Sequence, residues 1–144
     1  MAFGWMLVMA ALTMTVHFVQ LTVTRRIDLV AEPTLASVFW RTGEMNLLSA
    51  VELASWHVFF GLALVCAAVA FGGRGLEAAV RAGLGAGGVL CLAGLLGPAL
   101  ANPSLRLIGV VGYGAVFPAT CLLPGFVFRS ALQRATPRTM TTSV

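Results

Sequence analysis

Seven side chains that could bind a ligand or exchange a proton lie within or beside long apolar stretches of this 144-residue sequence. They are His17, Gln20, Glu52, Trp56, His57, Arg106 and Tyr113. Histidine changes its charge within the physiological pH range, and carboxylate and guanidinium groups bind ionic groups of a ligand. We expect these residues to form a polar pocket that binds a small molecule, a lipid or an ion.

Two other interpretations of these residues stay open. In the first, Glu52 pairs with Arg106 or caps the start of its own helix, while the histidines and Tyr113 form hydrogen bonds between helices. Such bonds average below about 1 kcal/mol in membranes but fix how helices pack, and the protein would then be a structural or accessory subunit of a membrane complex. In the second, His17 and His57 lie at similar depth and ligate a haem iron, as in an electron-transfer protein.

Motifs for catalysis and for metal binding are missing from the sequence. There is no Gly-x-Ser-x-Gly elbow, no His-Glu-x-x-His pair and no glycine-rich phosphate loop between a strand and a helix. Cys66, Cys91 and Cys121 fall in three different apolar runs without the spacing of a zinc site. We therefore predict no catalytic residue, no metal and no cofactor, and favour a non-enzymatic protein.

The composition is that of a membrane protein. Hydrophobic residues make up 59% of the chain and charged residues 10%, against about 45–50% and about 25% in soluble domains. The basic residues are all Arg, and the chain is rich in Ala, Gly, Val and Leu, which indicates a bacterial source. The arginines are scattered, so no basic stripe for nucleic acid exists, and the expected partner is the lipid bilayer.

Four apolar runs are long enough to cross a bilayer, which takes about 20 residues of helix. In lipid each segment must satisfy its own backbone hydrogen bonds, so these runs should be helices. The helices are expected at residues 3–24, 46–72, 78–101 and 105–129. Short turns make the last three helices antiparallel neighbours. The sequence predicts an all-α, four-helix transmembrane domain over residues 1–136 and a disordered tail at 137–144.

The connection between the first two helices, residues 25–44, mixes charged residues with Leu35, Val38, Phe39 and Trp40. This mixture is typical of a short amphipathic helix at the membrane interface, with Trp40 at the depth of the lipid headgroups. A plain loop is the alternative.

Small residues at helix spacing predict how the helices pack. Gly83, Gly87 and Gly94 lie on one face of the third helix, and such faces let helix backbones approach closely in lipid. The glycines serve either packing within the bundle or a homo-oligomer formed through the third helix.

The polar residues gather in one half of the predicted bilayer. At a rise of about 1.5 Å per residue, Gln20 and Glu52 lie roughly 6 Å below the surface on the side of the first loop. His17 and Tyr113 lie roughly 10 Å below it and His57 roughly 13 Å, while Arg106 lies at the surface itself. Polar groups at such depth normally face a bundle interior or a wet cavity.

The arginines also bear on orientation. With four spans both termini share one side, which holds five arginines, namely Arg74, Arg81, Arg129, Arg134 and Arg138. The other side holds four, namely Arg25, Arg26, Arg41 and Arg106. The excess favours cytoplasmic termini in a bacterial inner membrane, whereas the Arg25–Arg26 pair argues for the reverse.

Three stretches carry a resemblance to known proteins: Glu52–Leu64 (ELASWHVFFGLAL), residues 81–97, and Gly109–Pro118 (GVVGYGAVFP). Together they resemble the C-terminal half of uncharacterised bacterial multi-pass membrane proteins of unknown function, which usually have more than four spans. The resemblance implies no activity, cofactor or catalytic residue. It makes Glu52, Trp56, His57, Gly61 and Tyr113 the residues to test first.

Overall fold

The computed structural model describes residues 1–27, 31, 33–40, 46–123, 125 and 129. In this part of the chain every regular element is a helix. Four helical stretches are long and apolar enough to cross a membrane: Ala2–Arg26, Leu47–Ala68, Leu76–Ala99 and Pro103–Leu123. The predicted all-α four-helix bundle is confirmed, and the predicted tail at 137–144 lies outside the described residues.

Each stretch combines several elements. The first is α1 (Ala2–Thr22) with the 3-10 turn η1 (Thr24–Arg26). The second joins α3 (Leu47–Leu53), the π-helical segment η2 (Ala54–Phe59) and α4 (Phe60–Ala68). The third is α5 (Leu76–Ala93) followed by the short α6 (Leu96–Ala99). The fourth begins as α7 (Pro103–Val111) and continues through the π-helical segment η3 (Gly112–Val116).

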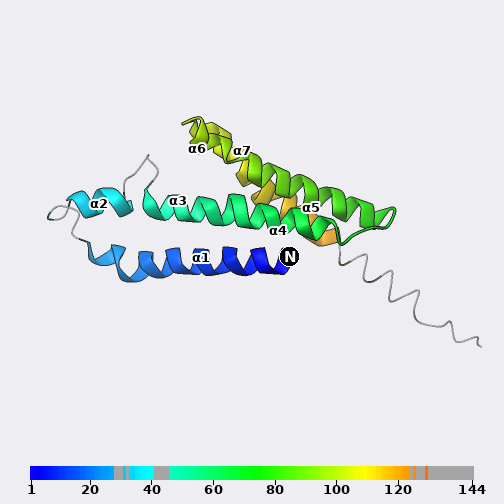
Figure 1. The fold of residues 1–144 in the computed structure, drawn as a ribbon, viewed down its shortest axis with the longest axis horizontal. Helices are drawn as coiled ribbons and strands as arrows, with labels where there is room; N and C mark the ends of the chain where they lie inside the picture. Colours follow the sequence, from blue (N-terminus) through cyan, green and yellow to red (C-terminus); the bar gives the residue numbers. More distant parts are fainter. Residues whose placement is uncertain (28–30, 32, 41–45, 124, 126–128, 130–144) are drawn as a thin grey trace, which may run out of the picture.

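The second stretch occupies the centre of the fold (Figure 1). On one side α1 packs against α3, η2 and α4, and on the other side α5 packs against α4, η2, α7 and η3. The buried core lies between α4 and α5, with Phe60, Leu64, Val80, Leu84 and Cys91 in one cluster. Since α1 has few buried residues, most of its apolar surface faces outward.

Glycines set the close approach of the helices. A Cβ atom on Gly88 would lie 2.7 Å from the carbonyl oxygen of Gly61, and one on Gly112 would lie 2.7 Å from that of Gly87. No side chain fits at these two crossings, because contacts between real Cβ atoms and backbone are longer. The α4, α5 and η3 backbones therefore touch.

The three glycines predicted to pack helices all face elements of the same chain. A Cβ on Gly83 would meet Thr120, one on Gly87 would contact η3 and Leu64, and one on Gly94 would meet the ring of His57. The face of the third helix that carries these glycines is therefore packed against other helices of the same bundle. A homo-oligomer through the third helix stays a prediction, and it would have to use the opposite face of α5.

The connection after α1 contains a helix, α2 (Pro33–Trp40), so of the two alternatives for residues 25–44 the structure has the helix. α2 contacts α3 and lies beyond the start of that helix (Figure 1). Its position at a membrane interface stays a prediction, and the side chain of Trp40 lies outside the described part.

The start of α3 corrects one expectation about Glu52. Asn46 caps this helix, because its Oδ1 accepts a hydrogen bond from the backbone N–H of Ser49 at 2.8 Å. Glu52 therefore does not cap the helix and is left for another role. Asn102 caps α7 in the same way, its Oδ1 accepting from the N–H of Ser104 at 3.0 Å.

Candidate functional site

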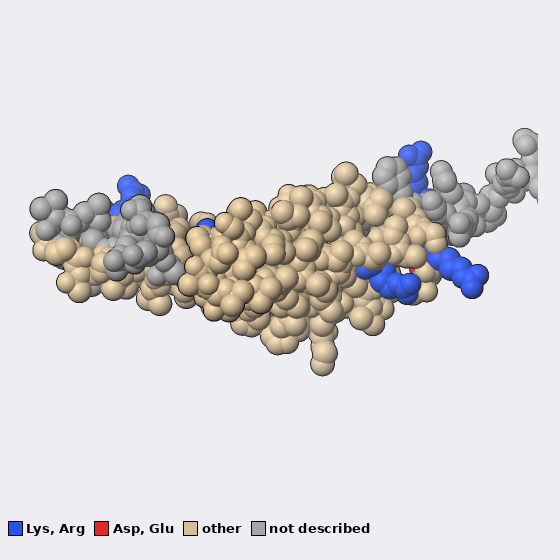
Figure 2. All heavy atoms as spheres, turned by 90° about the horizontal axis from the view of Figure 1, so that it is seen from above, with Lys and Arg blue, Asp and Glu red and all other residues tan. Residues whose placement is uncertain are grey.

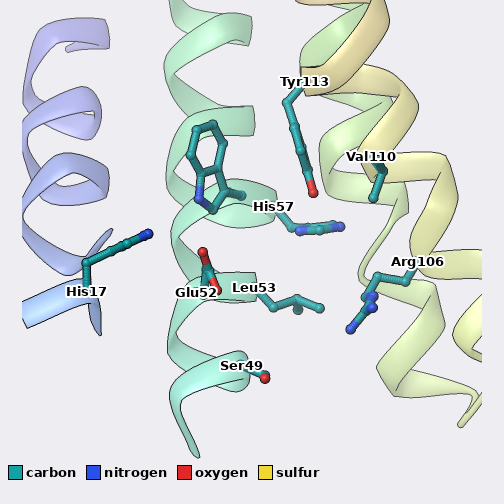
Figure 3. Close-up of a pocket in the computed structure, with 9 residues that line it drawn as sticks. His17, Ser49, Glu52, Leu53, His57, Arg106, Val110 and Tyr113 are labelled. Carbon is teal, nitrogen blue, oxygen red and sulfur yellow. The ribbon is translucent and has the colours of Figure 1, made fainter. Parts of the chain in front are cut away.

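A pocket of about 510 Å³ opens between α1, the α3–η2 segment and the α7–η3 segment. It lies at the end of the bundle where α1 ends and where α3 and α7 begin, as the depth argument predicts. Figure 3 shows side chains of three helices pointing into it. The lining residues are His17, Ser49, Glu52, Leu53, Trp56, His57, Arg106, Val110 and Tyr113.

Six of the seven residues singled out from the sequence line this pocket, and Gln20 does not. Three further lining residues, Ser49, Leu53 and Val110, were missed. Helical spacing offers a signal for them, because Ser49 lies one turn before Leu53 and Val110 one turn after Arg106. A search by polarity passes over Leu53 and Val110, since apolar side chains are ordinary in a spanning helix.

His57 is the unusual residue of the pocket. Its side chain is 2% exposed, and neither Nδ1 nor Nε2 forms a hydrogen bond of good geometry, although the backbones of Leu53 and Arg106 lie beside the ring. The ring fits a slot between α5 and α7 that two glycines leave open, because a Cβ on either Gly94 or Gly109 would collide with it. Leaving a buried polar group without a partner costs about 1–3 kcal/mol. Such a group calls for a water, an ion or a ligand beside it.

Aromatic rings close the deeper end of the pocket. The ring centroids of Trp56 and Tyr113 are 5.2 Å apart, and those of His57 and Tyr113 are 5.8 Å apart in an edge contact. Behind them Phe60 packs against Trp56 at 5.5 Å and against Phe117 at 4.9 Å. The pocket is therefore polar toward the end of the bundle and aromatic toward its middle.

Two side chains of opposite charge line the pocket. Glu52 comes from the central helix and Arg106 from the first turns of α7 (Figure 3). Both lie close enough to Tyr113 to act on its hydroxyl electrostatically. No salt bridge joins these two described residues, so the pairing that the structural interpretation expects is not formed.

None of the side chains that line the pocket forms a hydrogen bond to a side chain of another helix. His17 uses its Nδ1 within its own helix, 2.8 Å from the carbonyl oxygen of Thr13. The ring nitrogens of His57 lie near the backbones of Leu53 and Arg106 without a hydrogen bond of good geometry, and Tyr113 contacts its neighbours through its ring. Among the residues that line the pocket, polar groups thus meet in space without bonding one another across helices.

The geometry gives no support to haem ligation by the two histidines. An axial ligand must present a ring nitrogen to the iron, whereas the Nε2 of His57 lies against Gly94 and Gly109. Among the described residues no group of three His, Cys, Asp or Glu side chains is placed to hold a metal ion.

Both π-helical segments border the pocket. Trp56 and His57 belong to η2, and Tyr113 belongs to η3. A π-helix adds a residue to one turn, which rotates the side chains that follow, and such segments are frequent at functional sites. Here the two segments bring the three rings of the pocket into contact.

Comparisons with known proteins found no relative of this chain. No family, no curated protein and no solved structure matches the chain. The resemblance carried by Glu52–Leu64 and Gly109–Pro118 therefore stays untested, and the function has to be argued from the site.

Proposed function

We propose that the protein is a non-enzymatic, multi-pass protein of a bacterial inner membrane that binds a small molecule in the pocket between α1, η2 and α7. Four helices long and apolar enough to span a bilayer support the location. The surface agrees with it, since basic side chains lie toward the two ends of the long axis and the middle is largely free of charged side chains on the face shown in Figure 2. The arginine distribution supports cytoplasmic termini.

The state of His57 carries the proposal. Membrane helices gain little from polar contacts, so a histidine buried at membrane depth without a hydrogen bond is expensive unless something else uses it. It borders a pocket that also holds Glu52, Arg106 and Tyr113, and these groups are not bonded to one another. A ligand that fills the pocket gives Glu52, Arg106 and Tyr113 a partner next to this imidazole.

A larger side chain that fills the pocket tests the proposal. Val110 lines the pocket, whereas the next residue, Val111, is exposed on the outside of the same helix. Val110→Trp should occupy the space of the ligand, and Val111→Trp is the matched control. We expect native mass spectrometry of the chain, purified in mild detergent, to show a bound non-covalent mass in wild type and in Val111→Trp that is lost in Val110→Trp.

A bound mass that survives in Val110→Trp would refute the pocket, and so would a wild-type chain that carries none. Size-exclusion chromatography in detergent checks that both variants are folded. If the wild type instead retained a protein partner and no small molecule, the accessory-subunit interpretation would replace the proposal.

A further inference from the structure

The charges in the pocket restrict what it can hold. A purely anionic ligand would be attracted by Arg106 and repelled by Glu52, and a purely cationic ligand would meet the reverse. An unpaired charge is costly below the membrane surface, where Glu52 is expected, and less so for the exposed Arg106. Glu52 and Arg106 lie on different helices around one pocket without a salt bridge between them. A molecule that bears both charges at opposite ends satisfies both residues at once.

The surroundings of Glu52 suit an ammonium group. Trp56 lies one turn further along the same helix and lines the pocket with it. The rings of Trp56 and Tyr113, 5.2 Å apart, form an aromatic wall of the pocket that Glu52 also lines. Aromatic faces attract cations within about 6 Å, so this part of the pocket combines a carboxylate with two aromatic rings.

The surroundings of Arg106 suit a phosphate or a carboxylate. A guanidinium group presents planar pairs of N–H donors that match the oxygens of such anions. The backbone of Arg106 is fixed against α6, because a Cβ on Gly97 would lie 2.7 Å from the Arg106 nitrogen. The base of this side chain is therefore held firmly beside the pocket.

The walls of the pocket belong to helices that pack on different neighbours. On one side His17 belongs to α1, which packs on α3, η2 and α4. On the other side Arg106 and Val110 belong to α7, which packs on α5, α6 and η3. The two flanking helices are thus held by different neighbours, so a movement of α1 relative to α7 would open the pocket between them without breaking the packing of either helix.

From these observations we propose that the pocket binds a zwitterion, with its primary ammonium at Glu52, Trp56 and Tyr113 and its phosphate or carboxylate at Arg106. This inference rests on the proposed function and names the chemical class of its ligand. The zwitterion has two sources, the ethanolamine headgroup of a phospholipid or a free molecule such as phosphoethanolamine.

Thermal unfolding of the full chain in detergent separates these sources. The probes are short-chain phosphatidylethanolamine, free phosphoethanolamine, short-chain phosphatidylglycerol as an anion without ammonium, and hexylammonium as a cation without phosphate. We expect a raised midpoint with phosphatidylethanolamine and smaller effects of the two singly charged probes. A response to phosphoethanolamine as well shows that the headgroup alone suffices, and its absence assigns the site to the lipid.

Matched variants assign the response to the two charges. Glu52→Gln and Arg106→Gln should each weaken the apparent affinity for phosphatidylethanolamine about tenfold or more, since each removes a charge-assisted hydrogen bond. Glu77→Gln and Arg81→Gln remove the same charges from the start of α5, at the other end of the bundle, and should leave the affinity unchanged. If a glutamine variant does not fold, native mass spectrometry of wild type in mixed micelles compares retention of the two lipids directly.

The inference is overturned if phosphatidylglycerol stabilises or is retained as well as phosphatidylethanolamine, if no zwitterion has an effect, or if Glu52→Gln responds like wild type. Its failure is distinct from that of the proposed function. A bound mass lost only in Val110→Trp, together with no response to zwitterions, would leave the pocket standing with a ligand of another class.

Discussion

A single imidazole shows how the bundle makes room for a polar group. His57 extends from the central helix into the interface of α5 and α7, where Gly94 and Gly109 have no side chains to oppose it. The ring is buried with both nitrogens unpaired. These two glycines therefore serve the position of one side chain in addition to the approach of two helices.

The first prediction concerns Gly109, whose replacement by Ala would drive a methyl group into the ring of His57. We expect Gly109→Ala to destabilise the protein by about 1–3 kcal/mol, the usual cost of overpacking, and to lower the thermal midpoint in detergent. Gly114→Ala is the control five residues further on, because its Cβ would meet nothing nearer than 3.9 Å.

The cause is isolated by repeating the substitution in a His57→Ala background. Without the ring, the nearest remaining atom to the new methyl group is the carbonyl oxygen of Cys91 at 3.2 Å, so most of the cost should vanish. Equal costs of Gly109→Ala in the two backgrounds would show that helix packing alone, and not the imidazole, requires glycine there.

At the level of elements, the spanning helices were predictable because length and hydropathy decide them. Their ends were less so: the second stretch ends at Ala68 instead of residue 72, and the fourth begins at Pro103 instead of 105. Hydropathy is blind to end signals, here the Asn102 cap with Pro103 in the first helical turn. The segments η2 and η3 have no signature in composition.

The sequence predicted the level of the site residues along the helix axes, but not the side of each helix on which they lie. The rise per residue places His17, Glu52, His57 and Tyr113 at similar levels, and the structure gathers them in one pocket. Which way each helix turns about its axis depends on packing against its neighbours, so sequence alone does not show that Gln20 lies outside the lining. Three residues after His17, it is rotated by about 60° and lies nearer the helix end.

The turn between α6 and α7 yields a second prediction. Ala101 has a φ of 50°, in the left-handed region that side chains with a Cβ rarely adopt, and it is exposed. Ala101→Gly should stabilise the protein by about 0.5–1 kcal/mol, because glycine reaches this conformation without strain. The measurement is the thermal midpoint in detergent.

Ala99→Gly provides the comparison for that turn, since Ala99 is exposed within α6. There glycine should destabilise by about 0.5–1 kcal/mol, as it does inside helices generally. Two substitutions of one type, two residues apart, are therefore expected to have opposite signs. A loss of stability in Ala101→Gly would contradict the strain assigned to this turn.

At the scale of the whole molecule, the exterior is as apolar as the core. Large hydrophobic residues are exposed along α1, on α5 and on α7 (among them Phe3, Phe18, Val89 and Leu107), whereas few residues of α1 are buried. In water such a surface would drive association. In lipid it needs no cover, so a thin core and a loosely enclosed first helix are compatible with a stable bundle there.

The last prediction is the topology of this molecule. Four antiparallel spans put the α4–α5 turn and the C-terminus on one side, together with the larger share of arginines. In a bacterial host, fluorescent-protein fusions inserted at Gly73 or placed after Val144 should fluoresce, and alkaline phosphatase there should be inactive. A phosphatase inserted after Asn102 should be active, because the α6–α7 turn lies opposite. If the reporters at Gly73 and Val144 lie on different sides of the membrane, the prediction of four spans is wrong. If both lie on the periplasmic side and the α6–α7 turn lies in the cytoplasm, the Arg25–Arg26 pair, and not the overall arginine excess, sets the orientation.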